Sequence, residues 1–214
     1  MKTKIDSDIC RFVIFDVETT GLSPRAGDRV IEIGAAQVDI PLVTVPGSRG
    51  RALDIRRMSR RKNFSTLLQV DREVSYGAFM VNGITPGMLE DAPRAEEVWP
   101  EFLKFISGSC LIAHNVRFDL SFLLHELGLL KLNLPASHFL DTVRLARYLL
   151  PELRRYSLMS LAHFLEVGRV QEHRAMSDVE ITFEVFRALL AMADRRDLCT
   201  QEDLLRVSGG RHGR

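Results

Sequence analysis

A short apolar run that ends in two carboxylates constrains this chain more than any other segment. Residues 12–15 (FVIF) combine aromatic and β-branched side chains and predict a buried strand. Asp16 and Glu18 follow, and side chains two residues apart on a strand point to the same face. Neighbouring carboxylates raise each other's pKa unless a cation neutralises them, and Mg²⁺ or Mn²⁺ accepts such oxygen ligands. The pattern indicates a divalent-metal site at the end of this strand.

The residues after the pair decide between this interpretation and a simpler one, in which both acids end the strand in solvent. Composition alone favours the simpler explanation for a bare acid-x-acid pair. Here the pair lies within DVETTGL, where Thr19, Thr20 and Gly21 follow directly. Five fixed residues of the form D-x-E-T-T-G occur by chance in roughly one of several thousand chains of this length. Gly21 also permits a turn that brings backbone amides near a ligand, so the sequence favours a ligand site.

The rest of the chain alternates between strand and helix patterns. Residues 30–38 and 65–70 are expected strands, and because no helix joins them they predict an antiparallel pair. Residues 110–113 (CLIA) predict a short buried strand. Helices are expected at residues 95–108, 116–127, 142–150, from 157 onward and at 175–193. This order predicts an α/β fold with a mixed sheet.

Residues 39–62 do not follow this alternation. They contain two prolines, two glycines and seven basic residues against two acids, without apolar periodicity. We therefore expect a long loop, with a basic insertion at 41–62. One explanation is an arm that binds the backbone of a nucleic acid. A solvated insertion is the favoured explanation.

The overall composition limits the class of protein. The chain has 29 basic and 28 acidic residues, and a formal net charge of +1 argues against an all-over basic nucleic-acid binder. Cys10, Cys110 and Cys199 lie far apart and predict neither a disulfide framework nor a structural zinc site. No apolar run is long enough to span a bilayer, and the first residues lack the apolar core of a signal peptide. We expect a soluble, cytoplasmic protein without a membrane partner.

Two further segments place acids at expected strand and helix ends. His114 and Asn115 follow a buried strand, and Asp119 falls in the first turn of the next helix, where ligands of α/β sheets gather. The alternative is a carboxylate that only stabilises the helix start. His173 and Asp178 are five residues apart, about 140° on an ideal helix. The two side chains can reach one common centre only if His173 lies in the loop before the helix. A histidine of the site and an ordinary surface histidine are equally good interpretations.

In order and separation, these segments resemble the three motifs of the DEDDh family of 3′–5′ exonucleases. That family includes the proofreading epsilon subunit of bacterial DNA polymerase III and stand-alone enzymes. DVETTGL resembles the first motif, AHNVRFDLSFL the second and HRAMSDV the third. A block at 76–89, YGAFMVNGITPGML, is similar to the segment between the family's third strand and first helix. The resemblance extends over residues 11–193 and implies an RNase H-like fold with a mixed five-stranded sheet flanked by helices.

The resemblance also implies which residues act. Five residues match the catalytic positions of the family: the metal-binding acids Asp16, Glu18, Asp119 and Asp178, and the general base His173. They imply two divalent cations, Mg²⁺ or Mn²⁺, and two-metal hydrolysis. The implied substrate-binding residues are Thr19, Thr20, Gly21, Leu22, Asn82, His114, Asn115 and Phe118. Asn82 is a departure, because many relatives carry His at this position.

The implied activity is hydrolysis of the 3′-terminal phosphodiester of single-stranded or frayed DNA, with release of nucleoside monophosphates, in proofreading or repair. One alternative is the trimming of RNA 3′ ends by the same chemistry. The other is a non-catalytic module that docks a polymerase or clamp, and it is disfavoured because all five catalytic positions are filled.

Segments outside the motifs yield weaker expectations. Residues 201–205 (QEDLL) are similar to peptides that bind the sliding clamp, which would be a partner beside a DNA polymerase subunit, but a helix capped by TQED is favoured. Arg144 and Arg147 lie on one expected helix face, and a solvated face is favoured over a substrate contact. The expected divisions are an N-terminal extension at 1–10, an exonuclease domain at 11–194, and a C-terminal helix with a flexible tail at 195–214.

Overall fold

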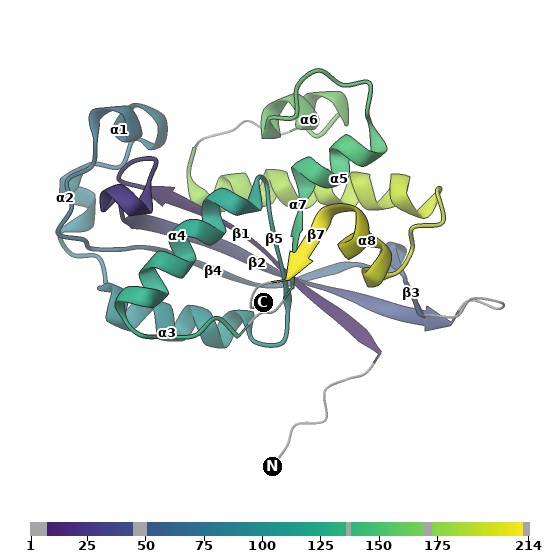
Figure 1. Ribbon diagram of the computed structural model, residues 1–214, viewed down its shortest axis with the longest axis horizontal. Coiled ribbons are helices and arrows are strands. Elements are labelled where there is room, and N and C mark those ends of the chain that lie inside the picture. Colours follow the sequence, from purple (N-terminus) through teal and green to yellow (C-terminus); the bar gives the residue numbers. More distant parts are fainter. Residues whose placement is uncertain (1–7, 45–50, 136–137, 169–172, 212–214) are drawn as a thin grey trace, which may run out of the picture.

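The described part of the chain is built around a sheet of seven strands. The computed structural model describes residues 8–44, 51–135, 138–168 and 173–211. The strands lie in the order β3-β2-β1-β5-β6-β7, and β4 also pairs with β2 (Figure 1). Their bounds are β1 Ile9–Thr19, β2 Val30–Thr44, β3 Arg51–Leu53, β4 Ser59–Leu67, β5 Cys110–Ala113, β6 His138–Asp141 and β7 Gly209–Arg211.

The sheet is mixed, as the sequence predicts. β1 and β4 each pair antiparallel with β2. β5 pairs in parallel with both β1 and β6, which helical crossovers allow. The sheet has two strands more than the expected five. β3 and β7 have three residues each, too few for an apolar alternation to be recognised in the sequence.

Helices cover both faces of the sheet. Their bounds are α1 Tyr76–Asn82, α2 Pro86–Leu89, α3 Ala95–Ile106, α4 Val116–Leu129, α5 Thr142–Leu149, α6 Leu158–Phe164, α7 Ala175–Asp194 and α8 Gln201–Ser208, with short turns η1 Pro24–Ala26 and η2 Ile55–Arg57. Alternation along β1 turns Phe12 toward α7, where its ring centroid lies 5.9 Å from that of Phe186. Phe15 faces the other side and lies 6.3 Å from Phe102 of α3. None of these described helices is long and apolar enough to cross a membrane.

One end of β1 lies between two groups of helices. Figure 1 shows α1 on one side of this end and α5 with α6 on the other. Ile14 pairs with Ile112 in parallel register, so β5 ends, at Ala113, just before the level of Asp16 in β1. Ligand sites in open α/β sheets form outside the carboxyl ends of such strands. The fold therefore places the first and second motifs at one edge of the sheet.

The basic segment is not the long loop that its composition predicts. β2, β3, η2 and β4 occupy most of its described part. Asp39 pairs with Arg11 of β1, so the segment lies toward the end of the sheet remote from Asp16. Arg61 of β4 also lies 3.4 Å from the Asp39 carboxylate. The prediction was wrong because residues 59–63 of β4 are half-buried or exposed, so no apolar alternation marks them. Backbone pairing with β2 and the ion pair of Arg61 with Asp39 hold them in the sheet.

The described residues near the two ends of the chain differ in part from the expected divisions. β1 begins at Ile9, so part of the expected N-terminal extension belongs to the sheet. α8 is the expected C-terminal helix, and β7 occupies the described residues that follow it, where a flexible tail was expected. Gly210 of β7 pairs with Phe139 of β6, and a Cβ on Gly210 would meet the Phe139 ring. The expectations for residues 1–7, 45–50 and 212–214 lie outside the described ranges.

α8 begins with the capping box that TQED predicts. Asp203 N donates to Thr200 Oγ1 at 3.1 Å, and Thr200 N donates to the Asp203 carboxylate at 3.2 Å. Leu204 is fully buried, and Cys10 Sγ donates to Gln201 Oε1 at 3.2 Å. Residues 201–205 therefore form a capped helix packed on the core, as TQED predicts.

Candidate active site

Three carboxylates meet at the end of β1. Asp16 and Glu18 leave one face of this strand, as its alternation predicts. Asp178 comes from the first turn of α7, which packs on the same face. One carboxylate oxygen from each of the three residues lies within 4.8 Å of the other two. A set of oxygen donors this close together fits a hard divalent cation.

Gly34 of β2 allows α7 to come this close to the sheet. It is the register partner of Asp16, so it lies directly beside the acid cluster. A Cβ at Gly34 would lie 2.6 Å from backbone atoms of Ala175 and Met176. Any larger residue would therefore push the first turn of α7, with its acid, away from β1.

Glu32 fixes the residues that precede α7. It is the register partner of Glu18 and is 4% exposed. Arg174 Nη2 and Nε donate to its two oxygens at 2.7 and 3.0 Å, and Ala175 N donates at 3.1 Å. Glu32, Gly34 and Arg174 were not predicted from the sequence as residues of the site. One sequence signal could have identified two of them: Glu32 and Gly34 are two residues apart on an expected strand and therefore share a face, and this strand pairs with β1.

Asp119 adds a fourth carboxylate from α4. β5 ends at Ala113, and Asn115 takes a left-handed conformation with φ of 67° just before α4 begins. Asp119 is buried, and its Oδ1 accepts a hydrogen bond from Val17 N at 3.2 Å. Because Val17 separates the two acids of β1, this bond places Asp119 against the strand that carries them.

The acids raise one another's pKa. Burial raises the pKa of Asp16 well above its usual range, and the charge of Asp119 adds to the effect. Burial, followed by the charge of Asp178, raises the pKa of Glu18 to about 8. Burial raises the pKa of Asp119 to about 8 against hydrogen bonds from backbone amides that lower it. Fully ionised, the cluster is unfavourable, and divalent cations would relieve the repulsion; the residues present thus fit such ions.

His173 lies in the loop before α7, the position that its five-residue spacing from Asp178 requires. Its φ of 49° is left-handed, a conformation that is costly for a residue other than glycine. Its side chain is exposed and lines the same cleft as Asp16 and Asp178. An imidazole there can exchange a proton with water beside the acids.

A cleft of about 720 Å³, here called the first cleft, brings twelve of the thirteen predicted site residues together. They are Asp16, Glu18, Thr19, Gly21, Leu22, Asn82, His114, Asn115, Phe118, Asp119, His173 and Asp178. Thr20 does not line it. Its Oγ1 accepts from Arg29 N at 3.0 Å, and its carbonyl accepts from Ser75 N at 2.9 Å. Thr20 therefore shapes the turn after β1.

The walls of the first cleft combine apolar and amide groups. Leu22 is 86% exposed at its rim, and Phe118 is half-buried. Asn82 is buried, and its Nδ2 donates to Thr19 O at 3.4 Å. A hydrogen bond from Asn82 also lowers the pKa of Glu18, against the larger effect of burial. The amide therefore lies beside the acid cluster.

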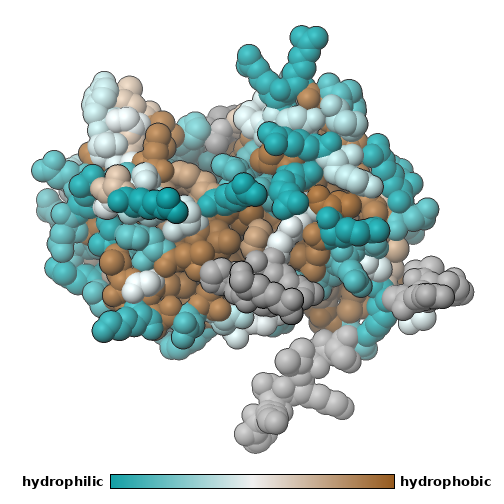
Figure 2. Space-filling model, in the orientation of Figure 1, coloured by the Kyte–Doolittle hydropathy of each residue, from teal (hydrophilic) through white to brown (hydrophobic). Residues whose placement is uncertain are grey.

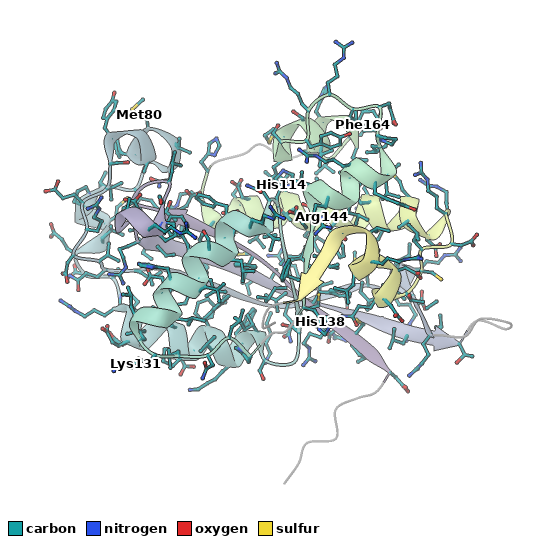
Figure 3. The ribbon with its side chains drawn as sticks, viewed as in Figure 1. Met80, His114, Lys131, His138, Arg144 and Phe164 are labelled. Carbon is teal, nitrogen blue, oxygen red and sulfur yellow. The ribbon has the colours of Figure 1, made fainter. Side chains whose placement is uncertain are left out.

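His114 ties β5 to α5. Its Nδ1 lies 2.9 Å from Thr142 Oγ1, the first residue of α5. Burial lowers the pKa of His114. Figure 3 shows the residue near the centre of the molecule, between α4 and α5. The ring therefore borders the site and also holds two elements together.

Comparisons with known proteins agree on one family. A family model described as Exonuclease (RNase_T) matches residues 13–186. DNA polymerase III subunit epsilon from Rickettsia typhi is 36% identical over 186 residues, which are 84% of this chain and 73% of that protein. The 3′-5′ exonuclease DinG of Bacillus subtilis is 32% identical over 198 residues, which are 92% of this chain but 19% of that protein.

A solved structure is similar over nearly its whole length. Exonuclease X, in complex with 5′ overhanging duplex DNA, has a TM-score of 0.62 and 26% identity, and the match covers 92% of this chain and 98% of that chain. Several curated relatives are much longer, and the chain spans 11–19% of their length. The family match at 13–186 contains the four acids and His173, and the chain belongs to the exonuclease family.

Proposed function

We propose that this protein is a 3′–5′ exonuclease that hydrolyses the 3′-terminal phosphodiester of single-stranded or frayed DNA with two divalent cations, Mg²⁺ or Mn²⁺. The observation that carries the proposal is the convergence of Asp16, Glu18 and Asp178 within 4.8 Å. Asp119 and His173 line the same cleft. The likeness to an exonuclease bound to DNA and to an epsilon subunit supports DNA as substrate, a role in proofreading or repair, and a polymerase subunit as partner.

The four acids divide between two cation sites. Asp16, Glu18 and Asp178 form one, since their oxygens lie together. Asp119, next to β1 through its bond from Val17 N, joins Asp16 at the other. Cations bound there would lower the pKa of the attacking water and would offset the charge on the leaving oxygen.

His173 acts as the general base. Its exposed imidazole lines the cleft beside the acids, where a ring nitrogen can accept a proton from water. It accepts a proton from a water molecule, whose oxygen forms a bond to phosphorus. The bond from phosphorus to the 3′ oxygen of the preceding nucleotide breaks, and that oxygen takes a proton from solvent. The product is a nucleoside 5′-monophosphate.

The first cleft receives the terminal nucleotide. Leu22 at the rim and Phe118 in the wall offer apolar surface to the base. The amide of Asn82 bonds to Thr19 O and Ile84 N and so holds the wall against which the sugar would lie. A base that enters this cleft has left its pairing partner, so single-stranded or frayed ends are the favoured substrates.

Incubation of 5′-labelled single-stranded DNA with the protein and Mg²⁺ should produce a ladder of shortened products. Asp16→Asn should abolish the ladder, and Asp91→Asn, at an exposed acid, should cleave as the wild type does. Matched RNA and blunt duplex substrates measure the preference for single-stranded DNA. Absence of a ladder with the wild type, or an equal ladder with Asp16→Asn, would refute the enzymatic proposal. Faster trimming of RNA would refute the choice of DNA.

A further inference from the structure

The catalytic acids also border a second hollow, next to α5 and α6. This second cleft has a volume of about 660 Å³. The residues it shares with the first cleft are Asp16, His114, Asn115, His173 and Asp178. The rest of its wall consists of Val143, Arg147, Tyr156, Ser157, Leu158 and Met159. The two clefts therefore meet at Asp16 and Asp178. Residues of α1 line the first cleft and residues of α5 and α6 line the second. Figure 1 shows α1 on one side of the end of β1 and α5 with α6 on the other.

Arg147 is held in the wall of the second cleft by an aromatic ring. Its guanidinium carbon lies 5.4 Å from the centroid of the Tyr156 ring, within the range of a cation–π contact. The Tyr156 hydroxyl donates to Leu150 O at 2.7 Å, which fixes the ring. None of the ion pairs found among the described residues involves Arg147. The ring therefore orients this positive charge, and no carboxylate of these pairs neutralises it.

The first cleft differs from the second in the charged and apolar residues that line it. Arg72 is the one Arg or Lys among its described lining residues, and it lies 3.4 Å from the carboxylate of Asp28. Leu22, Val81 and Phe118 give the wall apolar surface. The first cleft thus suits a base and a sugar better than it suits a phosphate.

Positive charge is concentrated around the second cleft. Residues 142–160 contain four arginines and a single acid, Glu152. Arg154 and Arg155 are exposed just before Tyr156, and Figure 2 shows hydrophilic side chains projecting on the side of α5 and α6. Arg144, one turn before Arg147, instead donates to Gly209 O at 2.9 Å and does not line the cleft.

We propose that Arg147 binds a backbone phosphate on the 5′ side of the scissile bond, and that the strand leaves the acids through the second cleft. A 3′-terminal nucleotide has no phosphate beyond its own sugar, so the cleft that receives it needs no cation there. Each nucleotide on the 5′ side carries a phosphate, which a guanidinium binds through charge-assisted hydrogen bonds. This inference rests on the proposed function and adds a determinant of affinity for longer strands.

Two substrates that share the terminal nucleotide test the assignment. The p-nitrophenyl ester of thymidine 5′-monophosphate has an aromatic leaving group in place of the 5′ strand, whereas an oligothymidylate has the full strand. Arg147→Ala should lower kcat/KM for the oligothymidylate about tenfold, mainly through KM, and leave ester hydrolysis within about twofold. Arg147→Lys keeps the charge and should recover part of the loss. Arg144→Ala, the matched control on the same helix, should resemble the wild type with both substrates.

Salt dependence and folding provide two further readouts. Loss of one phosphate contact should reduce the slope of log kcat/KM against log salt concentration by about 0.7 for a single strand. Thermal unfolding should show that Arg147→Ala is as stable as Arg144→Ala. An equal loss with both substrates, or no loss with either, would overturn the assignment of Arg147 and leave the proposed function standing. Hydrolysis of neither substrate by the wild type would overturn the proposed function as well.

Discussion

Replacing Glu18 by Gln should stabilise the metal-free protein while it removes the activity. Burial, followed by the charge of Asp178, raises the pKa of Glu18 from 4.5 to about 8. The folded protein therefore keeps this proton to a higher pH than the unfolded chain does. The stability that protonation provides is fully present below pH 4.5 and is lost as the pH rises through about 8. The Glu18→Gln variant carries no charge at this position, so its stability does not fall when the pH rises through this range.

The structure sets the size of the effect. One pKa unit corresponds to about 1.4 kcal/mol, so the shift from 4.5 to about 8 sets an upper limit of about 5 kcal/mol. Glu18 is partly exposed, and screening by solvent lowers this figure. We expect the variant to gain about 1–3 kcal/mol in free energy of unfolding above pH 8. For a chain of this size, that gain raises Tm by about 2–12 °C.

Thermal unfolding in EDTA measures this gain. Wild type and Glu18→Gln should have similar Tm near pH 4.5 and differ near pH 9, about one unit above the raised pKa of Glu18. Mg²⁺ should then raise the Tm of the wild type far more than that of the variant. Glu73→Gln, at an exposed acid, is the matched control and should show no such change. If Glu18→Gln unfolded at a lower temperature than the wild type at the alkaline pH, the carboxylates would not repel one another and the reasoning would be refuted.

Three further substitutions test the geometry. Gly34→Ala should lower the free energy of unfolding by about 1–3 kcal/mol and reduce kcat, because the added Cβ would displace the start of α7. Urea unfolding and the rate on single-stranded DNA measure both effects, and Gly128→Ala, where a Cβ meets nothing within 4 Å, is the control that should leave the rate unchanged. His173→Ala should lower kcat by about 10²–10⁴-fold while Mg²⁺ still raises Tm; a lost Mg²⁺ effect would contradict its role as base. Leu22→Ala should raise KM without changing Tm, because this side chain is 86% exposed, and unchanged kinetics would exclude it from the substrate contact.

The positions of the candidate catalytic residues could be predicted from the sequence where they follow from local geometry. Alternation on one strand puts Asp16 and Glu18 on a common face, and the structure has them there. Helix geometry requires His173 to lie ahead of the helix that carries Asp178, and it does. Asp119 was implied by resemblance, because only the register between β1 and β5 brings it to the other acids.

The features that the sequence did not predict depend on contacts between distant segments. Glu32 has the same setting as Glu18 in the sequence, near one end of an expected strand, and the two are register partners. Arg174, 142 positions later, is what distinguishes them, because it neutralises Glu32. β7 likewise forms because Gly210 fits against Phe139 of a distant strand, and no local apolar pattern marks it.

A formal net charge of +1 conceals a separation of charge that the fold produces. An arginine beside Asp16 and Glu18 would stabilise the metal-free cluster as Arg174 stabilises Glu32, but it would compete with cations for the same oxygens. Arg174 and Arg72, close to the site, pair with other acids, and none of the ion pairs among the described residues involves Asp16 or Glu18. The raised pKa of Glu18 is consistent with this, because burial and then the charge of Asp178 raise it more than the hydrogen bond from Asn82 lowers it. Phosphate is repelled by the same carboxylates, so we expect the cations to bind before the nucleic acid, and the positive charge that attracts the strand to lie beyond the cluster, in the second cleft.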